Sequence, residues 1–339
     1  MRAAVFHGPG QPLAIEVVPT PSPGPGEILM KVAACGVCHT DLHYIEHGVA
    51  TFKKPPLILG HEAAGTVAAL GPGVTNFKVG DRILLPAVVT CGRCTLCRTG
   101  RENICSQMVM FGNNVDGAYA EFVVAPAKDA FPLPEEVPLE EGSIIADAVS
   151  TPYHAVKNRA RIEPGEVVVV FGCGGVGINA VQMAAVAGGI VIAVDIADRK
   201  LEWARKFGAQ QIYNPTGREA VKELRKLTAG GPDVVLEAIG NPTTIAQGYD
   251  LVRTGGRLCV IGYTNQPLSL NPAKLMYREV TVVGSLGCRP VDYPRLIEMV
   301  RVGKVEVRAQ VTHRFPLDKI GDAFEVMRRG ESLRSIVIP

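Results

Sequence analysis

Residues 167–177 read VVVVFGCGGVG, and the rest of the chain is arranged around this stretch. The apolar run 167–171 is typical of a strand whose two faces are both covered, as in a parallel sheet. A glycine-rich turn follows, then a small-residue helical segment at 178–188, then a second apolar run at 190–194 that leads into Asp195. Strand, glycine turn, helix, strand and acidic residue together predict a dinucleotide-binding unit.

Each glycine of the turn has its own physical role. Gly172 permits a tight turn, Gly174 lets the backbone approach a pyrophosphate, and Gly177 allows the helix and strand to pack closely. The phosphates would lie at the helix N-terminus, where unpaired N–H groups and the helix dipole favour an anion. The turn also contains Gly175 and Val176, and the flanking strands and helix strengthen a pattern that would be weak evidence by itself.

The composition is that of an ordinary globular protein. The chain has 339 residues, 47% hydrophobic and 20% charged, which is enough for two domains that each bury a core. The net charge is +2 without a long basic run, which argues against a nucleic-acid partner. No apolar stretch has the length of a membrane span or the form of a signal region. The nine cysteines, most of them at metal-like spacings, indicate a reducing cytoplasm rather than disulfides.

Four cysteines lie close together in the first half of the chain. They are Cys91, Cys94, Cys97 and Cys105, in the pattern C-x2-C-x2-C-x7-C. Four thiolates on one short loop form a closed tetrahedral set, which is the usual arrangement for structural zinc. A zinc ribbon that binds nucleic acid is the alternative, but no basic patch flanks these cysteines. The loop 91–105 therefore predicts a zinc ion that stabilises the fold.

The other segments indicate an α/β protein of two domains. Residues 150–286 are expected to form a six-stranded, doubly wound parallel sheet with helices between its strands. Residues 1–149 and 287–339 are expected to form a second, mainly β domain. Residues 139–158 are expected to be helical. Further strands of the parallel sheet are expected at 234–238, 257–262 and 281–284.

Several motifs, in this order and spacing, make the chain resemble the zinc-containing alcohol dehydrogenases of the medium-chain dehydrogenase/reductase family. The family's fold is a Rossmann domain inserted in a GroES-like catalytic domain, which agrees with the organisation above. Length and loop pattern are closest to the bacterial and archaeal members, so the resemblance implies a homotetramer or a homodimer. The motifs are GVCHTD at 36–41, GHE at 60–62, the four-cysteine loop, the GxGGVG turn and the terminal Arg334.

The resemblance implies a catalytic zinc site. Cys38 and His61 would bind the zinc, Asp41 would orient a metal-bound histidine, and Glu62 matches an acid that can approach the metal. The family's third ligand is usually a cysteine, and Asp147 occupies that position here. A carboxylate in so apolar a run is costly unless it is paired, so we expect Asp147 to bind the metal. The alternative is that Asp147 caps or bridges a helix while Glu62 binds the metal.

The resemblance also implies a path for the proton that leaves the alcohol. Thr40 matches the hydroxyl that hydrogen-bonds the substrate oxygen, and His43 matches the histidine that passes the proton to solvent. The offset of His43 from Cys38 supports this role. The remaining histidines considered have no such spacing and are expected to be structural: His7, His47, His154 and His313.

The cofactor assignment depends on a few positions. Asp195 ends the second strand, where a carboxylate can hold both ribose hydroxyls, and this predicts NAD rather than NADP. Lys200 matches the family's ribose-contacting lysine. His39 and Arg334 match the positions where the family places cations on the pyrophosphate.

Three functions are consistent with these features. The first is hydride transfer between NAD(H) and a small-molecule alcohol, or its aldehyde or ketone, with two zinc ions per chain. The second is reduction of a larger carbonyl or an acyl-CoA-type substrate by a member of the same family. The third is a member that only binds ligands and is not an enzyme. The pair of Thr40 and His43 favours the first function, and no nucleic-acid or membrane partner is expected.

Overall fold

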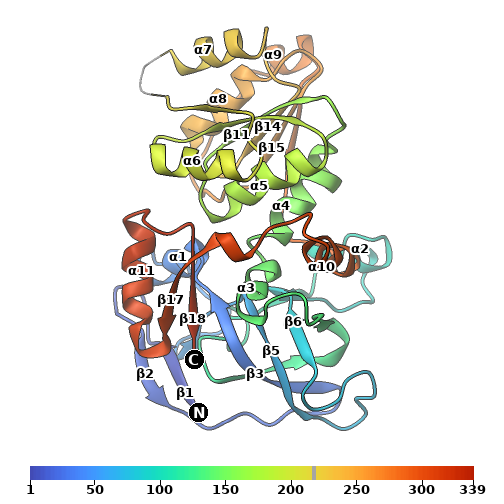
Figure 1. Ribbon diagram of the computed structural model, residues 1–339, viewed down its shortest axis with the longest axis vertical. Helices are drawn as coiled ribbons and strands as arrows, with labels where there is room; N and C mark the ends of the chain where they lie inside the picture. The colour runs from blue at the N-terminus through green and yellow to red at the C-terminus, as the bar shows by residue number, and fades with distance from the viewer. Residues whose placement is uncertain (216–218) are drawn as a thin grey trace. The chain divides into compact units, whose positions relative to one another are not determined.

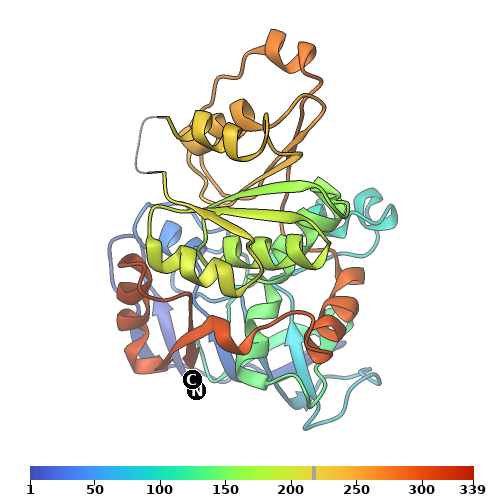
Figure 2. The ribbon, with the colours of Figure 1, turned by 45° about the horizontal axis from the view of Figure 1, so that its top comes forward.

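The computed structural model describes residues 1–215 and 219–339, which divide into two compact units. Unit 1 comprises Met1–Ser150 and Gly287–Pro339, and unit 2 comprises Thr151–Leu286. Both marked ends of the chain therefore belong to unit 1 (Figure 2). Unit 2 is accordingly an insertion between two separate parts of unit 1.

Unit 2 is built on a six-stranded parallel sheet with the order β13-β12-β11-β14-β15-β16. The central strand β11 (Val167–Phe171) pairs with β12 (Ile190–Val194) on one side and with β14 (Val234–Glu237) on the other. From β11 the chain first adds strands β12 and β13 on one side of the sheet and then returns to add β14, β15 and β16 on the other side. The turn after β11 therefore lies at a topological switch point. The expected doubly wound sheet is confirmed. Its outer strands are β13 (Gln211–Tyr213), β15 (Arg257–Val260) and β16 (Thr281–Gly284).

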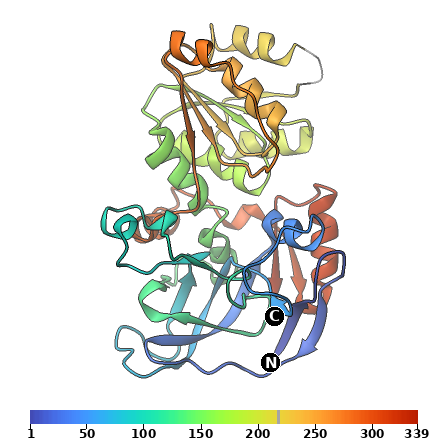
Figure 3. The same ribbon diagram turned by 180° about the vertical axis from the view of Figure 1, so that it is seen from behind.

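Helices cover both faces of this sheet. On one face, nearer the viewer in Figure 1, lie α5 (Gly175–Val186) and α6 (Asp198–Lys206). On the other face, seen in Figure 3, lies α8 (Pro242–Leu251), which packs against α7 (Ala220–Leu227). Right-handed crossovers between parallel strands produce this division. The small side chains of α5 let it pack closely on the sheet. The last helix of the unit is α9 (Pro272–Tyr277).

Unit 1 contains a seven-stranded, mainly antiparallel sheet. Its long central strand β3 (Glu27–Gly36) pairs with β5 (Ala63–Leu70), β9 (Phe122–Pro126) and β18 (Arg334–Ile338). Helix α11 (Ile320–Arg328) packs on the β17–β18 side of the sheet (Figure 1). The remaining strands of this sheet are β6 (Arg82–Leu85), β10 (Phe131–Pro132) and β17 (Val311–Pro316). Two smaller sheets comprise β1 (Arg2–Phe6), β2 (Ala14–Val17) and β4 (Leu57–Ile58), and β7 (Val88–Val89) and β8 (Val109–Met110).

The segment 139–158, expected to be helical, is helical but interrupted. Helix α3 (Leu139–Gly142) continues as a 3-10 turn that ends at Ala146. Asp147 has φ −143° and ψ −58°, outside the helical region, and helix α4 (Ser150–His154) starts three residues later. Asp147 therefore lies in a bend between two helical segments. The other helices of unit 1 are α1 (His39–Ile45), α2 (Thr95–Arg98) and α10 (Tyr293–Arg301), and a π-helix (Ala155–Ala160) follows α4 in unit 2.

Each unit has its own apolar core. In unit 1, Ile28 and Met30 of β3 are fully buried in a cluster that also includes Phe324 of α11. In unit 2, Val169 of β11 and Val235 of β14 are fully buried in a second cluster. Two separate cores are what a chain of this length is expected to form. Within residues 1–215 and 219–339, every helix is too short or too polar to span a bilayer.

Candidate metal and cofactor sites

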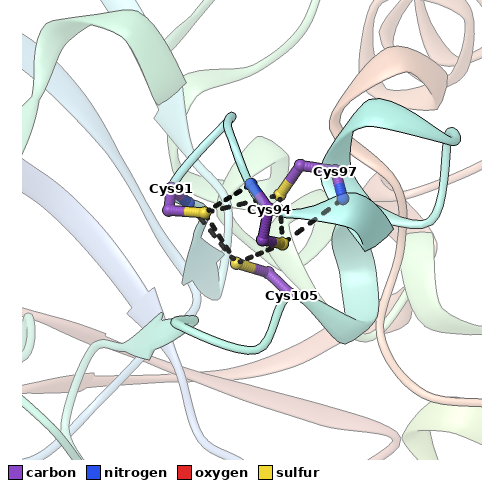
Figure 4. A group of neighbouring side chains, drawn as sticks. All are labelled: Cys91, Cys94, Cys97 and Cys105. Carbon is purple, nitrogen blue, oxygen red and sulfur yellow. Dashed lines mark hydrogen bonds between the residues drawn. The ribbon is translucent and has the colours of Figure 1, made fainter.

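The four cysteines of the loop 91–105 converge on one point (Figure 4). Their Sγ–Sγ distances are 3.9 Å for Cys91–Cys97, 3.5 Å for Cys94–Cys97, 3.8 Å for Cys94–Cys105 and 3.5 Å for Cys91–Cys105. A zinc ion at the centre of a tetrahedron, with Zn–S bonds of about 2.3 Å, separates its sulfurs by about 3.8 Å. The sulfurs therefore fit a structural zinc ion.

Backbone N–H groups turn toward these sulfurs. The Cys94 N–H donates to Cys91 Sγ at 3.3 Å, and the Cys97 N–H donates to Cys94 Sγ at 3.5 Å. The amides of Cys97 and Ser106 lower the pKa of Cys94 to about 5, whereas burial raises the pKa of Cys97 to about 12. Zinc binds thiolates and releases their protons, so amides that stabilise a thiolate also favour the metal.

A second group of donors lies in unit 1. It contains Cys38, His61, Glu62 and Asp147, and one ligand atom of each lies within 4.8 Å of the others. Asp147 Oδ2 is 3.6 Å from His61 Nε2 and 4.0 Å from Cys38 Sγ. Around a tetrahedral zinc ion, sulfur, nitrogen and oxygen donors would be about 3.3 to 3.6 Å apart. The Asp147 oxygen therefore lies within a few tenths of an ångström of ligand spacing from both His61 and Cys38.

The orientation of His61 supports a metal at this point. Its side chain is buried, and neither ring nitrogen has a hydrogen-bond partner among the described residues. A buried polar atom left without a partner costs about 1–3 kcal/mol. Nδ1 lies 3.6 Å from Asp41 Oδ1, and a carboxylate there favours the proton on Nδ1. Nε2, the nitrogen that faces Asp147, is then left with a lone pair for a metal ion.

The groups around His61 carry negative charge. Burial by itself lowers the pKa of His61, but the carboxylates of Asp41 and Asp147 outweigh burial and raise it well above its usual value. Burial by itself raises the pKa of Cys38, but the neighbouring His61 imidazole outweighs burial and lowers it. A dication at this position would balance these charges.

Tyr119 holds Asp41 in place. Its buried hydroxyl donates to Asp41 Oδ2 at 2.7 Å, and the Cys38 N–H lies 3.4 Å from the same oxygen. The ring packs against Gly60, where a Cβ would lie 2.8 Å from it, and the Tyr119 N–H donates to the Leu59 carbonyl at 3.0 Å. Tyr119 is thus fixed beside the residue that precedes His61. Its contact with Asp41 was not predicted, because no motif marks it.

Glu62 is paired with Arg334. Both side chains are buried, Arg334 Nε donates to Glu62 Oε2 at 3.1 Å, and Arg334 Nη2 donates to Glu62 Oε1. The carboxylate of Glu62 is therefore held by a guanidinium, whereas Asp147 Oδ2 faces His61 and Cys38. This arrangement favours Asp147 over Glu62 as the metal ligand. The role of Arg334 on a pyrophosphate stays a prediction.

Two hydroxyl groups brace the bend that contains Asp147. Tyr293 donates to the Ala146 carbonyl at 2.7 Å, and Ser150 Oγ donates to the same carbonyl at 3.0 Å. The Tyr293 ring also stacks on Phe131, with centroids 5.0 Å apart. These contacts fix the backbone directly before Asp147. No motif predicts the Tyr293 contact, because it joins residues 147 positions apart.

The first turns of α1 carry the residues expected to bind substrate and move the proton. Thr40 Oγ1 lies 3.5 Å from Cys38 Sγ, so its hydroxyl is beside the second donor group. His39 is exposed at the start of the helix. His43 lies one turn further on, and its Nδ1 is 3.0 Å from Nδ1 of His47, a residue expected to be only structural. Partial burial and then the charge of His47 lower the pKa of His43.

In unit 2, the glycine turn has the shape expected for a dinucleotide site. Gly172 has φ +89°, and a Cβ at Gly177 would lie 1.8 Å from the Gly172 carbonyl oxygen. These two positions require glycine. A Cβ at Gly174, the N-cap of α5, would instead meet open space. The side of the turn at Gly174 is thus open to an approaching phosphate, and Gly175 and Val176 begin the helix behind it.

Asp195 lies immediately after β12 and beside the glycine turn. Its Oδ2 accepts from the Cys173 N–H at 2.8 Å, and its Oδ1 accepts from the Ala197 N–H at 3.0 Å. The carboxylate is therefore fixed, and each oxygen keeps a second lone pair for a ribose hydroxyl. Lys200 follows in the first turn of α6. Both residues are on the same unit as the turn, as the cofactor assignment requires.

Comparison with known proteins finds two family models that match this chain. Residues 24–135 match the family model described as "Alcohol dehydrogenase GroES-like domain". Residues 175–301 match the model described as "Zinc-binding dehydrogenase". The first match contains Cys38 and His61 of the second donor group as well as the four-cysteine loop. The second begins within the glycine turn.

Relatives match the chain over its full length. An alcohol dehydrogenase of Geobacillus stearothermophilus is 34% identical over 100% of this chain and 99% of its own. A sorbitol dehydrogenase of Bacillus subtilis is 35% identical over 100% and 97%. The solved alcohol dehydrogenase of Aeropyrum pernix superposes with a TM-score of 0.92 at 34% identity, over 100% of both chains.

These matches and the two donor groups lead to one conclusion about the reaction. Zinc and NAD are the cofactors, and the reaction is hydride transfer between an alcohol and NAD(H). The GroES-like and Rossmann folds expected from the motifs are confirmed. The chain belongs to the zinc-containing alcohol dehydrogenases of the medium-chain dehydrogenase/reductase family.

Proposed function

We propose that Cys38, His61 and Asp147 hold the catalytic zinc and that the four-cysteine loop holds a second, structural zinc. The observation that carries the catalytic site is His61, buried between two carboxylates with Nε2 directed at Asp147. One thiolate, one carboxylate and a neutral imidazole balance a dication, and three protein ligands leave a fourth position for substrate. Unit 1 would then be the catalytic domain and unit 2 the cofactor domain.

In the reaction, the bound zinc supplies a Lewis acid and the bound NAD supplies a hydride acceptor. The chain's own residues orient the metal-facing imidazole and move the proton. Asp41, held by Tyr119, keeps the His61 proton on Nδ1 and so keeps Nε2 directed at the metal. Thr40 Oγ1 accepts the proton of the substrate hydroxyl and passes on its own. His43 receives a proton further along the helix and conducts it outward.

A substrate panel tests this function. Metal-replete protein should oxidise small or medium alcohols with NAD and reduce the matching aldehydes or ketones with NADH. The panel should include sorbitol, because relatives with this architecture include a sorbitol dehydrogenase as well as alcohol dehydrogenases. Activity confined to larger carbonyls or to acyl-CoA-type substrates would favour the second function considered above. No turnover in either direction would favour a binding protein.

Replacing Asp195 should relax the choice of cofactor. A 2′-phosphate about 4 Å from this fixed carboxylate costs on the order of 4 kcal/mol per charge pair at a near-surface dielectric. We expect kcat/KM for NAD to exceed that for NADP by at least about 100-fold, a difference of about 2.7 kcal/mol. In Asp195→Ala the value for NADP should rise and the value for NAD should fall.

The matched control is Asp198→Ala, three residues further on. Asp198 Oδ1 accepts from Asn214 rather than from the glycine turn, so its loss should leave the preference for NAD in place. Steady-state kinetics with both cofactors provide the measurement. Comparable kcat/KM values for NAD and NADP in the unaltered enzyme would contradict the assignment, as would an Asp195→Ala variant that gains nothing with NADP.

The edge strand of unit 2 supports an oligomer. β16 ends the parallel sheet, so its outer side has backbone groups that no further strand of this sheet pairs with in the described residues. Val282 on β16 and Leu286 just after it are exposed, as are Met276 and Tyr277 of α9. Such an edge pairs readily with a second copy through a two-fold axis. We propose that dimers form here and assemble further into a homotetramer.

Light scattering on the purified enzyme tests the oligomer. Four chains per particle are expected, and Val282→Lys should reduce the particle to smaller species, because it places a charge in the proposed apolar contact. Thr281→Lys places the same charge at the neighbouring exposed position of the strand. It tests whether assembly depends on the apolar side chain of Val282 or on the strand edge as a whole. A monomer in the unaltered enzyme would contradict the proposal.

The cysteines support a cytoplasmic location. All nine are unbridged in the structure, and five of them belong to the two proposed metal sites. Zinc thiolate ligands of this kind last in a reducing compartment, where disulfides do not form. We propose that the enzyme works in the cytoplasm, with small-molecule substrates and without a nucleic-acid or membrane partner.

A further inference from the structure

We propose that His47 is the terminal proton acceptor of the relay, which takes the proton that His43 releases and delivers it to bulk water. The inference rests on the role of His43 in the proposed function and extends that path by one residue. His47 acts through His43 and does not touch the substrate.

The two imidazoles are in hydrogen-bond contact. Their Nδ1 atoms lie 3.0 Å apart, and the ring centroids lie 5.2 Å apart with an interplanar angle of 44°. One Nδ1 must donate and the other accept, so the pair shares one proton. The backbone fixes this contact, because the Glu46 N–H donates to the Leu42 carbonyl at 2.8 Å and the Val49 N–H donates to the His43 carbonyl at 3.1 Å. His47 is therefore turned back over the last turn of α1.

The two rings differ in exposure in the direction that a relay requires. His43 is half-buried and His47 is exposed. Partial burial lowers the pKa of His43, and the charge of His47 lowers it further. A proton that reaches His43 is therefore held weakly and is readily passed on. Glu46 directly precedes His47 and is paired with Arg328 of α11, which also pairs with Glu325. Glu46 is thus already neutralised by an ion pair.

The proton transfer balances without another reactant. His43 begins neutral with its proton on Nδ1, donated to Nδ1 of neutral His47. A proton arriving at His43 Nε2 forms a new N–H bond there, and the Nδ1–H bond breaks as its proton moves to His47 Nδ1. His43 is again neutral, and His47 is an imidazolium that gives a proton to water or buffer. Carbonyl reduction runs the same steps in reverse.

Proton release separates this role from a structural one. Stopped-flow measurements of alcohol oxidation in weak buffer, with a pH indicator, follow proton release and NADH formation in the same reaction. In the metal-replete holoenzyme, His47→Gln should slow proton release about 3- to 10-fold, a modest part of what a general base usually contributes. Added imidazole should restore the rate, because a small base can take the proton from His43 directly.

Three further variants serve as controls for the His47→Gln result. His7→Gln removes another exposed histidine, which pairs with Glu16, and should release protons like the unaltered enzyme. Adding His47→Gln to His43→Gln should cause no further slowing. If His43→Gln is slowed but His47→Gln is not, the inference about His47 is overturned and the proposed relay stands. If neither substitution slows proton release, the proposed relay fails as well.

Discussion

Replacing His61 with asparagine is expected to lower kcat/KM by about 10³- to 10⁴-fold, because the site loses the nitrogen that faces the metal. The asparagine amide can still face Asp41, the carboxylate that lies 3.6 Å from Nδ1. We therefore expect the melting temperature to change little. Metal analysis should show the loss of one zinc per chain while the four-cysteine site keeps the other. The measurements are steady-state kinetics, zinc content and thermal unfolding of the same preparation.

The matched control is His313→Asn, a partly buried histidine on β17 that stacks on Phe315. It belongs to neither donor group, so zinc content and turnover should stay at the values of the unaltered enzyme. A His61→Asn protein that retains both zinc ions and near-normal turnover would show that His61 is not a ligand. The catalytic assignment would then be wrong.

Replacing Cys97 with alanine is expected to have the largest effect on stability. The substitution leaves three thiolates close together and opens a closed structural site, which should release its zinc. We expect a loss of about 3 kcal/mol in the free energy of unfolding and a fall in melting temperature of about 5–10 °C. Zinc content should fall by one ion per chain, and the remaining ion should be the catalytic one.

Cys259→Ala provides the comparison, because Cys259 is a fully buried cysteine of β15 outside both donor groups. Burial raises its pKa to about 12, so it stays a thiol at neutral pH. Its loss removes one small apolar group and should cost about 1 kcal/mol. Equal melting temperatures for the Cys97 and Cys259 variants would mean that the loop binds no stabilising metal.

Local patterns in the sequence predicted the parts of the structure that depend on nearby residues. The glycine turn needs a tight bend at Gly172 and a close contact at Gly177, and both requirements arise within a few residues. The four-cysteine loop is equally local. The parallel sheet followed from buried apolar runs, because strands covered on both faces have few polar residues.

The catalytic site depends on contacts that no local pattern encodes. Cys38, His61 and Asp147 lie far apart in the sequence, and only the family resemblance grouped them. Tyr119 reaches Asp41 over 78 residues, and Arg334 reaches Glu62 over 272. Long antiparallel pairings of β3 bring these segments together, and such pairings are set by the whole sheet.

Two features near the site have only a partial local signal in the sequence. His47 follows His43 by four residues, the spacing at which helical side chains meet, but the helix ends at Ile45 and the contact depends on the turn beyond it. Asp147 interrupts a segment expected to be helical. Its polar side chain in an apolar run predicts a metal ligand, but nothing in the run predicts the bend in the backbone.

Anomalous diffraction at the zinc edge, on crystals of the metal-replete enzyme, tests the central claim about the three ligands most directly. We predict two peaks per chain, one among the four cysteines and one bound by Cys38, His61 and Asp147. The second peak should lie about 2.0–2.2 Å from an Asp147 carboxylate oxygen, the usual Zn–O distance. A peak bound by Glu62, with Asp147 more than about 3 Å away, would contradict the account, since Zn–O bonds are not that long.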